Sequence, residues 1–538
     1  MHNFETVGIM VDLSRNAVMT LDGWNRFLPI ISKMGYNAVF LYMEDTYEVE
    51  DEPYFGYMRG RYSINEMKAL DALGEKYGVE MIPCIQTLAH LEPIIKWNIY
   101  PNDTSDILLV GDERTYDLIR NMFKTLKKCF KTRRIHVGMD EAHMLGKGNY
   151  LDRNGYKNQG DIIREHLARV AQIAEEYGYE ALMWSDMFFR GWNGGDYYMR
   201  ENGVIPDEYK NALPESFVPV YWDYYMKSET RYDLMLNIHR QLSDKTMFAG
   251  GLWTWLGPSP DNIHSVETML PAIRMCKKHG IKNVFFTMWG NDGGECSRFS
   301  MLPALYYIAE YIRGNEDEAK IKAGFGAEFG ISYDDFTLLD LPNYVGRFGS
   351  PWATNPVKYG LYSDCFQGFL DYLVTEGGDA EYKEYAVKLA AVESRAGEYS
   401  YLFKVSRLLC EILSLKYELG VKTRSAYKSG DKAELLRLIN ENYALIPDLV
   451  SELYEAFRDQ WHRENKRFGF EVQDYRFGGL IARIKTQMGI LLDYVEGRID
   501  SIEELEGDIL KYLNREAGKS MYFNCHHQNI SSNYVKFG

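Results

Sequence analysis

The chain has 538 residues, of which 46% are hydrophobic and 26% charged, so it is long enough for two or three globular domains. Its formal net charge of −16 argues against a nucleic-acid partner, because phosphate backbones bind basic surfaces. No run of 18 apolar residues is present, so no membrane span is expected. The seven cysteines are scattered without a CxxC pair, and the N-terminus lacks a signal-peptide pattern, which together favour a cytoplasmic location.

Eight short β-rich runs alternate with amphipathic helical stretches over roughly the first 312 residues. The runs begin at Val7, Ala38, Glu80, Arg134, Ala181, Val218, Met247 and Asn283. Strands that alternate with helices form parallel sheets, and eight such units in succession predict a closed (β/α)8 TIM barrel, which we assign to residues 1–340. Beyond it the strand pattern gives way to long helical patterns, so residues 341–538 are predicted to form an all-α helical domain.

Acidic, basic and aromatic residues gather at the C-terminal ends of the predicted strands. They are Asp12, Arg15, Glu44, Asp45, Gln86, His90, Asp140, Glu141, Trp184, Asp186, Trp222, Asp223, Trp253, Trp255, Trp289, Asn291 and Asp292. In a (β/α)8 barrel these ends converge on one face, where such enzymes carry their active sites. We therefore expect a single cleft lined by carboxylates and large aromatic rings.

The stretch "RIHVGMDEAHMLGKG", which starts at Arg134, allows three interpretations. Its letters DEAH match a helicase motif, but no GxxxxGK[ST] phosphate loop precedes them. A metal site would draw on His90, His136, Asp140 and His143, yet HExxH is absent and the first strand lacks the H-x-H that metal-dependent barrel hydrolases usually carry there. The favoured interpretation is glycoside hydrolysis, in which two neighbouring carboxylates protonate the leaving oxygen and stabilise an oxocarbenium-like centre.

Several barrel segments, in the right order, resemble glycoside hydrolase family 20, the β-N-acetylhexosaminidases. "VDLSRN" resembles the family's D-x-S-R-H, and "GYNAVFLYMED" resembles its N-x-x-x-x-H-L-x-D-D. "YGVEMIPCIQTLAH" resembles G-I-x-x-I-P-E-I-x-x-P-G-H, and "RIHVGMDE" resembles H-I-G-G-D-E. "MWSDMF" and "FFTMWGND" resemble the later W-x-E and M-W-x-E tips. The resemblance covers the barrel and assigns nothing to the helical domain.

This resemblance implies an exo-acting enzyme that removes terminal β-linked GlcNAc or GalNAc with retention and needs neither cofactor nor metal. Glu141 would be the general acid and then the base. Asp140 would hold the N–H of the 2-acetamido group, whose oxygen attacks C1 and gives an oxazolinium intermediate. The family's tyrosine that steadies the acetamido oxygen is assigned to Tyr225, with Tyr224 as the second candidate, because the seventh strand lacks the family's Y-L-D.

The resemblance also implies which side chains hold the sugar. Arg15 would donate its fork of N–H groups to the 3- and 4-hydroxyls. The other residues expected to line the pocket or hold outer hydroxyls are Asp45, His90, Trp184, Trp222, Tyr224, Trp253, Trp289, Asp292 and Glu295. The third-strand segment departs from the family in lacking its acid and its Pro-Gly.

Other activities stay open at this stage. A retaining glycosidase for sugars without an acetamide would use Asp140 as a covalent nucleophile. A metal-dependent barrel hydrolase and a non-catalytic carbohydrate-binding protein are the further alternatives. The sequence also leaves open a homodimer and the preference between GlcNAc and GalNAc.

Overall fold

The computed structural model describes residues 4–199, 201, 203–211, 213–346, 355–511 and 526–532. The chain folds as two compact units. The barrel unit comprises Met1–Leu252, Ser265–Trp289 and Ala304–Glu316, and the helical unit comprises Trp253–His264, Gly290–Pro303 and Asp317–Gly538. Residue 340, where the sequence pattern suggests the domain boundary, lies within the helical unit, and helices lie on both sides of residue 316.

The barrel unit is built around eight parallel strands. They are β1 (Thr6–Asp12), β2 (Ala38–Tyr42), β3 (Glu80–Cys84), β4 (Arg134–His136), β5 (Glu180–Trp184), β6 (Phe217–Trp222), β7 (Met247–Gly251) and β8 (Asn283–Met288). Each strand pairs with the next, and β1 also pairs with β8, so that Gly8 lies opposite both Ala38 and Phe285. The ring is therefore closed, and the predicted TIM barrel is confirmed.

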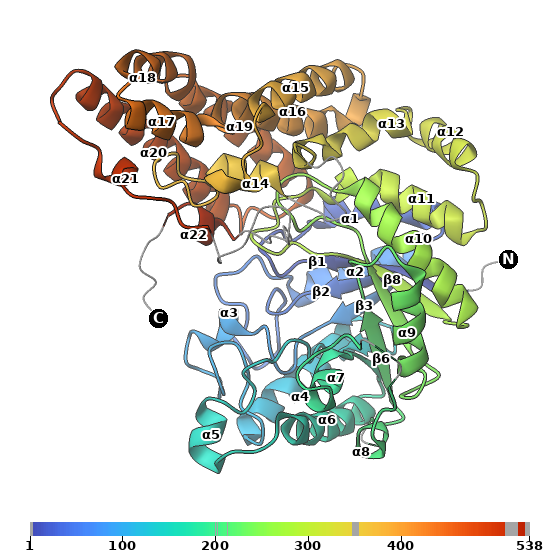
Figure 1. Ribbon diagram of the computed structural model, residues 1–538. Coiled ribbons are helices and arrows are strands. Elements are labelled where there is room, and N and C mark those ends of the chain that lie inside the picture. Colours follow the sequence, from blue (N-terminus) through green and yellow to red (C-terminus); the bar gives the residue numbers. More distant parts are fainter. Residues whose placement is uncertain are drawn as a thin grey trace. The chain divides into compact units, whose positions relative to one another are not determined.

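Helices follow the strands and surround them in Figure 1. They are α1 (Leu21–Lys33), α2 (Ile64–Tyr77), α3 (Glu92–Ile95), α4 (Glu113–Cys129), α5 (Asn149–Asn154), α6 (Gln159–Glu176), α7 (Asp186–Trp192), α8 (Asp207–Lys210), α9 (Glu229–His239), α10 (Asn262–Lys278) and α11 (Leu302–Ile312). Local chemistry sets their ends. For example, Ser63 and Glu66 form a capping box at the start of α2, and Gly78, with a φ of 68°, ends that helix.

The interior of the barrel is filled by apolar side chains rather than being a pore. The ring of Phe40 stacks on the ring of Phe285 with centroids 4.2 Å apart. Gly8 makes room for this pair, because a Cβ at that position would lie 2.8 Å from the Phe40 ring. Burying each such phenylalanine contributes about 1.5–3 kcal/mol, so the interior both stabilises the barrel and fixes where its strand ends lie.

The helical unit contains the remaining helices of the described chain. They are α12 (Glu318–Phe329), α13 (Tyr333–Phe336), α14 (Pro356–Tyr362), α15 (Gly378–Glu393), α16 (Ser400–Lys416), α17 (Leu419–Ser429), α18 (Lys432–Leu438), α19 (Ile446–Glu464), α20 (Glu471–Val495), α21 (Glu503–Glu506) and α22 (His527–Ile530). Gly397, with a φ of 57°, lies in the break between α15 and α16. The predicted all-α architecture of this region is confirmed.

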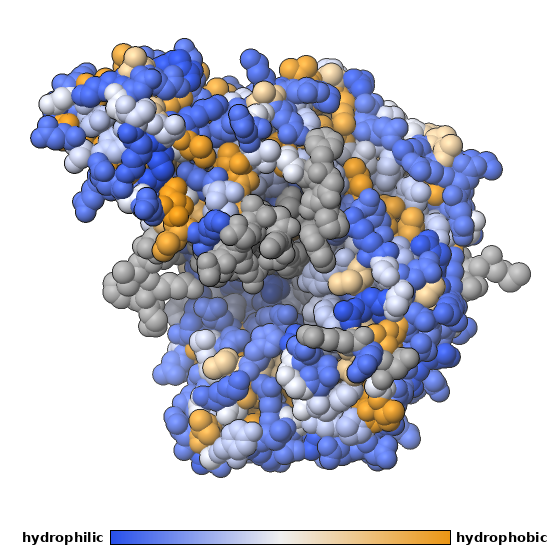
Figure 2. Space-filling model, in the orientation of Figure 1, coloured by the Kyte–Doolittle hydropathy of each residue, from blue (hydrophilic) through white to orange (hydrophobic). Residues whose placement is uncertain are grey.

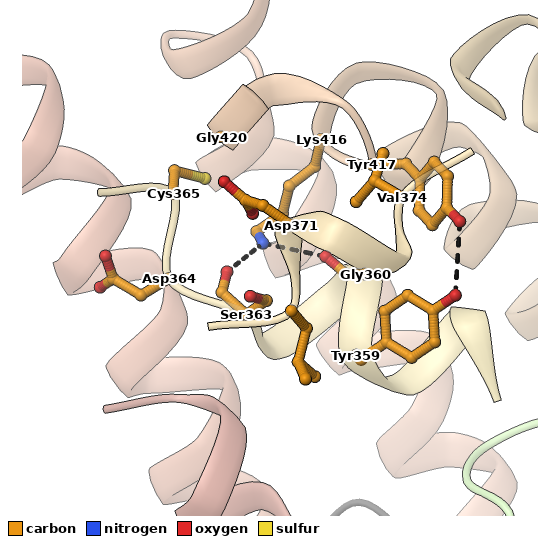
Figure 3. A pocket seen from close by; sticks show the side chains of 11 residues that line it. Tyr359, Gly360, Ser363, Asp364, Cys365, Asp371, Val374, Lys416, Tyr417 and Gly420 are labelled. Carbon is orange, nitrogen blue, oxygen red and sulfur yellow. Dashed lines mark hydrogen bonds between the residues drawn. The ribbon is translucent and has the colours of Figure 1, made fainter. Parts of the chain in front are cut away.

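A small cavity in the helical unit is lined by residues of α14, α16 and the segment between residues 363 and 374 (Figure 3). Buried Lys416 donates hydrogen bonds of 2.9 Å and 2.7 Å to the carbonyl oxygens of Gly360 and Ser363. Burial raises the pKa of nearby Asp371 to about 6. The cavity measures about 10 Å³, which suits about one water molecule and is too small for a sugar.

The surface in Figure 2 is mostly hydrophilic, with hydrophobic residues in small separate patches. Among the described residues, no helix combines the length and the apolar character that a membrane crossing requires. The six cysteines in the described chain are buried and unpaired, and Cys525 lies outside the described residues.

Candidate active site

The end of β4 brings two adjacent carboxylates to the same side of the chain. Side chains alternate along a regular strand, so Asp140 and Glu141 could not both face one cleft if the strand continued. Instead the backbone turns, with φ values of 72° at Gly138, 70° at Met139 and 52° at Glu141. As a result His90 Nε2 lies 3.2 Å from an Asp140 oxygen and 3.6 Å from a Glu141 oxygen.

Both carboxylate oxygens of Asp140 have a donor. Gln86 Nε2 donates to Oδ1 at 2.8 Å, and His90 Nε2 lies 3.2 Å from Oδ2. Burial raises the pKa of Asp140, but His90 and Gln86 outweigh it, so the pKa lies below its usual value. Gln86 can approach because residue 138 is glycine, since a side chain there would overlap the Gln86 amide. Asp140 is thus an oriented, ionised carboxylate.

Glu141 is held through its backbone by a third acid. Its N–H donates to Asp186 Oδ2 at 3.0 Å, while its own side chain is 44% exposed. Asp186 is fully buried at the start of α7, and Arg190 Nε lies 3.6 Å from Oδ2. Burial together with the charges of Asp140 and Glu141 raises the pKa of Asp186 to about 7. Asp186 therefore fixes the backbone of Glu141 in its left-handed conformation.

Arg15 stands beside a second group of acids. Its Nη1 lies 2.9 Å from Glu44 Oε1 and 3.4 Å from Asp12 Oδ2. Its Cζ lies 5.4 Å from the ring centroid of Tyr42 and 5.9 Å from that of Trp289. Burial lowers the pKa of Arg15, but Glu44 and Asp12 outweigh it and raise the pKa well above its usual range. A quarter of the side chain remains exposed, so part of the guanidinium can reach a ligand.

Aromatic side chains form a continuous wall in the barrel unit. Trp184 lies 6.1 Å from Trp289, and Trp222 stacks on Tyr224 with centroids 5.4 Å apart. Burial raises the pKa of Tyr224 well above its usual range, and hydrogen bonds with Trp289 and Thr287 act in the opposite direction. Trp222, Trp289 and Tyr225 are only half-buried, so their rings offer surface to a ligand.

Asp45 occupies a different environment from the one predicted. It is fully buried, and Arg59 Nε donates to its two oxygens at 3.2 Å and 3.1 Å. Arg59 also donates to Asn16 and to the carbonyl of Ser14. Glu44, the preceding residue, is the acid that faces Arg15. We therefore regard Asp45 as an anchor for Arg59 rather than as a sugar ligand.

Three residues predicted for the same pocket belong to the helical unit: Trp253, Asp292 and Glu295. Trp253 is buried and stacks on Trp255 at 4.3 Å. Asp292 and Glu295 pair with Lys358 and Arg476 at 2.7–2.9 Å. These carboxylates are occupied by internal ion pairs, which explains how Glu295 can be buried and Asp292 half-buried there.

Tyr42, Glu44, Gln86 and Asp186 join the site, although the family resemblance assigns none of them a function. Gln86 bridges Tyr42 and Asp140, and Tyr42 donates to Glu44 at 3.0 Å. Glu44, Gln86 and Asp186 are among the polar residues predicted at the strand ends, so the sequence marks their position but not their partners. Tyr42 is the last residue of β2, and its apolar surroundings in the sequence predict a core residue. Only the hydrogen bonds of its hydroxyl show that it belongs to the site.

His90, Asp140 and Glu141 could also be considered as metal ligands, since one donor atom from each lies within 4.8 Å of the others. A ligating imidazole must be neutral. Burial lowers the pKa of His90, but the negative charges of Asp140 and Glu44 raise it by more than burial lowers it. The resulting pKa is about 9. At neutral pH His90 is therefore a cation paired with Asp140, and a metal ion could bind there only by displacing its proton.

Sequence comparison matches both parts of the chain to known families. The family models described as "Glycosyl hydrolase family 20, catalytic domain" and "Glycoside Hydrolase 20C C-terminal domain" match residues 4–206 and 334–524. Hexosaminidase D of Bos taurus is 24% identical over 282 residues, which cover 48% of this chain and 72% of that protein. Hexosaminidase D of Homo sapiens is 24% identical over 221 residues, covering 37% of this chain and 41% of that protein.

Among solved structures, a GH20 exo β-N-acetylglucosaminidase from Vibrio harveyi has a TM-score of 0.46 at 14% identity, covering 63% of this chain and 59% of that one. The barrel and its paired carboxylates define a glycoside hydrolase of the TIM-barrel class. The two family models, one matching each part of the chain, specify the family within this class. The chain belongs to glycoside hydrolase family 20.

The pKa of His90 gives a prediction for pH dependence. Its value of about 9 exceeds that of a free imidazole, so between about pH 6.5 and 9 the folded state holds a proton that the unfolded state has lost. Stability from this ion pair is complete below pH 6.5 and disappears as the pH rises through 9. The thermal midpoint of the wild type should fall over that range more steeply than that of His90→Gln. Parallel curves would contradict the ion pair.

Asp186 gives a second prediction. Asp186→Ala removes the acceptor for the Glu141 N–H and should lower kcat at least about tenfold with little change in KM, because the sugar contacts remain. Asp186→Asn keeps an acceptor oxygen and should recover most of kcat. Steady-state kinetics of both variants test this, and an equal loss in the two would show that the charge, not the hydrogen bond, matters.

Proposed function

We propose that the protein is an exo-acting β-N-acetylhexosaminidase that removes terminal β-linked GlcNAc or GalNAc with retention, through an oxazolinium intermediate. In this mechanism Glu141 protonates the glycosidic oxygen while the acetamido oxygen of the substrate attacks C1. Glu141 then takes a proton from the water that opens the intermediate. Its exposure of 44% allows it to meet both the leaving group and the water.

One observation carries the substrate-assisted step: both oxygens of Asp140 are held by Gln86 and His90. A carboxylate fixed and ionised in this way is well placed to orient an acetamido N–H and to favour the positive charge that develops on the acetamide. As a covalent nucleophile it would be weakened, because a donor on each oxygen withdraws electron density and lowers the nucleophilicity of both. The observation therefore favours the proposed mechanism over the covalent alternative.

Other features of the barrel unit support binding of a polar sugar. Among the described residues, buried Trp184 Nε1 has no hydrogen-bond partner, and such an atom is costly unless a ligand or water satisfies it. The half-buried rings of Trp222 and Trp289 suit the apolar face of a pyranose. Arg15 would bind ring hydroxyls while Glu44 and Asp12 hold it in place.

The acetamido oxygen needs a hydroxyl donor in this mechanism. Tyr224 and Tyr225 both follow β6 and remain the candidates. Tyr224 lies within the electrostatic reach of Asp140, and its hydroxyl interacts with Trp289, so it is at the wall of the site. Tyr225 is half-buried, and its backbone N–H is fixed by Asp223 at 3.0 Å.

Substitutions of Glu141 and Asp140 should affect two substrates differently, because the two carboxylates have different roles. Glu141→Gln should lower kcat/KM on β-linked GlcNAc disaccharides about a thousandfold, with a smaller loss on nitrophenyl β-GlcNAc, whose leaving group needs less protonation. Asp140→Asn should lose activity on both substrates to a similar degree, because it acts on the acetamide. Full activity of Glu141→Gln on the disaccharide would contradict the assignment of the acid.

A chelator separates the proposed enzyme from the metal-dependent alternative. Dialysis against EDTA should leave kcat on nitrophenyl β-GlcNAc unchanged, because the proposed steps use Glu141, Asp140 and the substrate's own acetamide and no metal ion. A loss of activity that Zn²⁺ or Mn²⁺ restores would instead establish a metal hydrolase. Nitrophenyl β-glucoside serves as the control substrate, and the proposed mechanism predicts negligible turnover of it.

A further inference from the structure

Four exposed apolar side chains gather on the loops that follow β2 and β3. We call Tyr54, Tyr57, Met58 and Trp97 the aromatic platform; each is between 42% and 64% exposed. Tyr57 meets Trp97 edge to face with centroids 5.3 Å apart, and Tyr54 meets Tyr57 in the same way at 5.8 Å. Exposed clusters of this kind on a single unit mark binding sites rather than core packing.

The platform is rigidly built from two separate loops. Buried Glu52 accepts a hydrogen bond from Tyr100 at 3.1 Å and two from Arg114 at 2.7 Å and 2.6 Å. Beside Tyr54, Phe55 is fully buried and packs on Tyr47 at 5.1 Å. The hydrogen bond from Tyr100 to Glu52 therefore joins the loop that carries Trp97 to the loop that carries Tyr57. The exposed rings are thus held in place before any ligand binds.

The two loops that carry the platform also contribute residues to the candidate active site or next to it. Arg59, next to Met58 in the chain, bonds Asp45, and Gly56 is packed so closely on the Asp45 carbonyl that no side chain fits there. Asp45 follows Glu44, whose carboxylate contacts Arg15. The short helix α3 separates Trp97 from His90 in the chain, and His90 contacts both catalytic carboxylates. Both loops extend from strand ends on the face of the barrel that carries the site.

We infer that the aromatic platform binds the leaving part of the substrate, and that this part is a sugar. The inference rests on the proposed function and adds the substrate class: an oligosaccharide whose second or third ring stacks on Tyr57 and Trp97. Pyranose rings have apolar C–H faces that suit flat aromatic side chains. Four side chains offer much less than the roughly 800 Å² per partner that a stable protein interface needs, so a protein occupant is not favoured.

Two substrates that share the reacting sugar test the inference. Methyl β-GlcNAc has a leaving group too small to reach the platform, whereas the β-1,4-linked GlcNAc trimer extends two further rings. Trp97→Ala and Tyr57→Ala should each raise KM for the trimer about tenfold, which corresponds to about 1.4 kcal/mol of binding free energy. Neither should change KM for the methyl glycoside more than twofold. Trp97→Phe keeps a flat ring and should recover most of the trimer affinity.

A matched control is Tyr77→Ala, because Tyr77 ends α2 just before β3 and so lies at the opposite face of the barrel. It should alter neither substrate. Equal effects of Trp97→Ala on both substrates, or none on the trimer, would overturn the inference, and so would a wild type that cleaves the methyl glycoside but not the trimer. If the wild type cleaves neither, the proposed function itself fails, a result distinct from the other two. Thermal unfolding verifies that each variant is folded.

Discussion

The pairing of Asp140 with His90 and Gln86 is the interaction on which the rest of the site depends. It keeps a buried carboxylate ionised, which would otherwise be costly, and it fixes that carboxylate in one orientation. The same His90 lies beside Glu141, so one cation organises both acids. Gln86 and His90 follow β3 and Asp140 follows β4, so the pairing of these two strands is a precondition for the arrangement.

The barrel could be predicted from the sequence because each of its parts is local. A β-rich run, a helix and a turn repeat eight times, and the strand ends are marked by polar residues. Asp140 and Glu141 stand out for the same reason, since two carboxylates end an apolar run. The helical region was predicted only as a class, because helical periodicity does not show where α15 ends and α16 begins, or that the barrel unit ends at Glu316.

Pairing between distant residues is what the sequence could not supply. Asp45 and Glu44 are neighbours with similar chemistry, and only the position of Arg59 shows that one is an internal anchor and the other faces Arg15. Asp292 appears at a strand tip like the other acids, yet it is neutralised by Lys358 and Arg476, more than 60 residues away. Side chains of one type thus take different roles according to partners that composition and spacing do not specify.

The central claim is that the substrate's own acetamide is the nucleophile, held by Asp140. It is tested most directly by measuring kcat/KM for nitrophenyl β-GlcNAc in which the acetyl group carries zero, one, two or three fluorine atoms. Each fluorine makes the acetamido oxygen a weaker nucleophile while leaving the leaving group unchanged. The proposed mechanism predicts a steep fall in kcat/KM with each added fluorine, by orders of magnitude across the series. Rates independent of fluorination would contradict it and would return Asp140 to the role of covalent nucleophile.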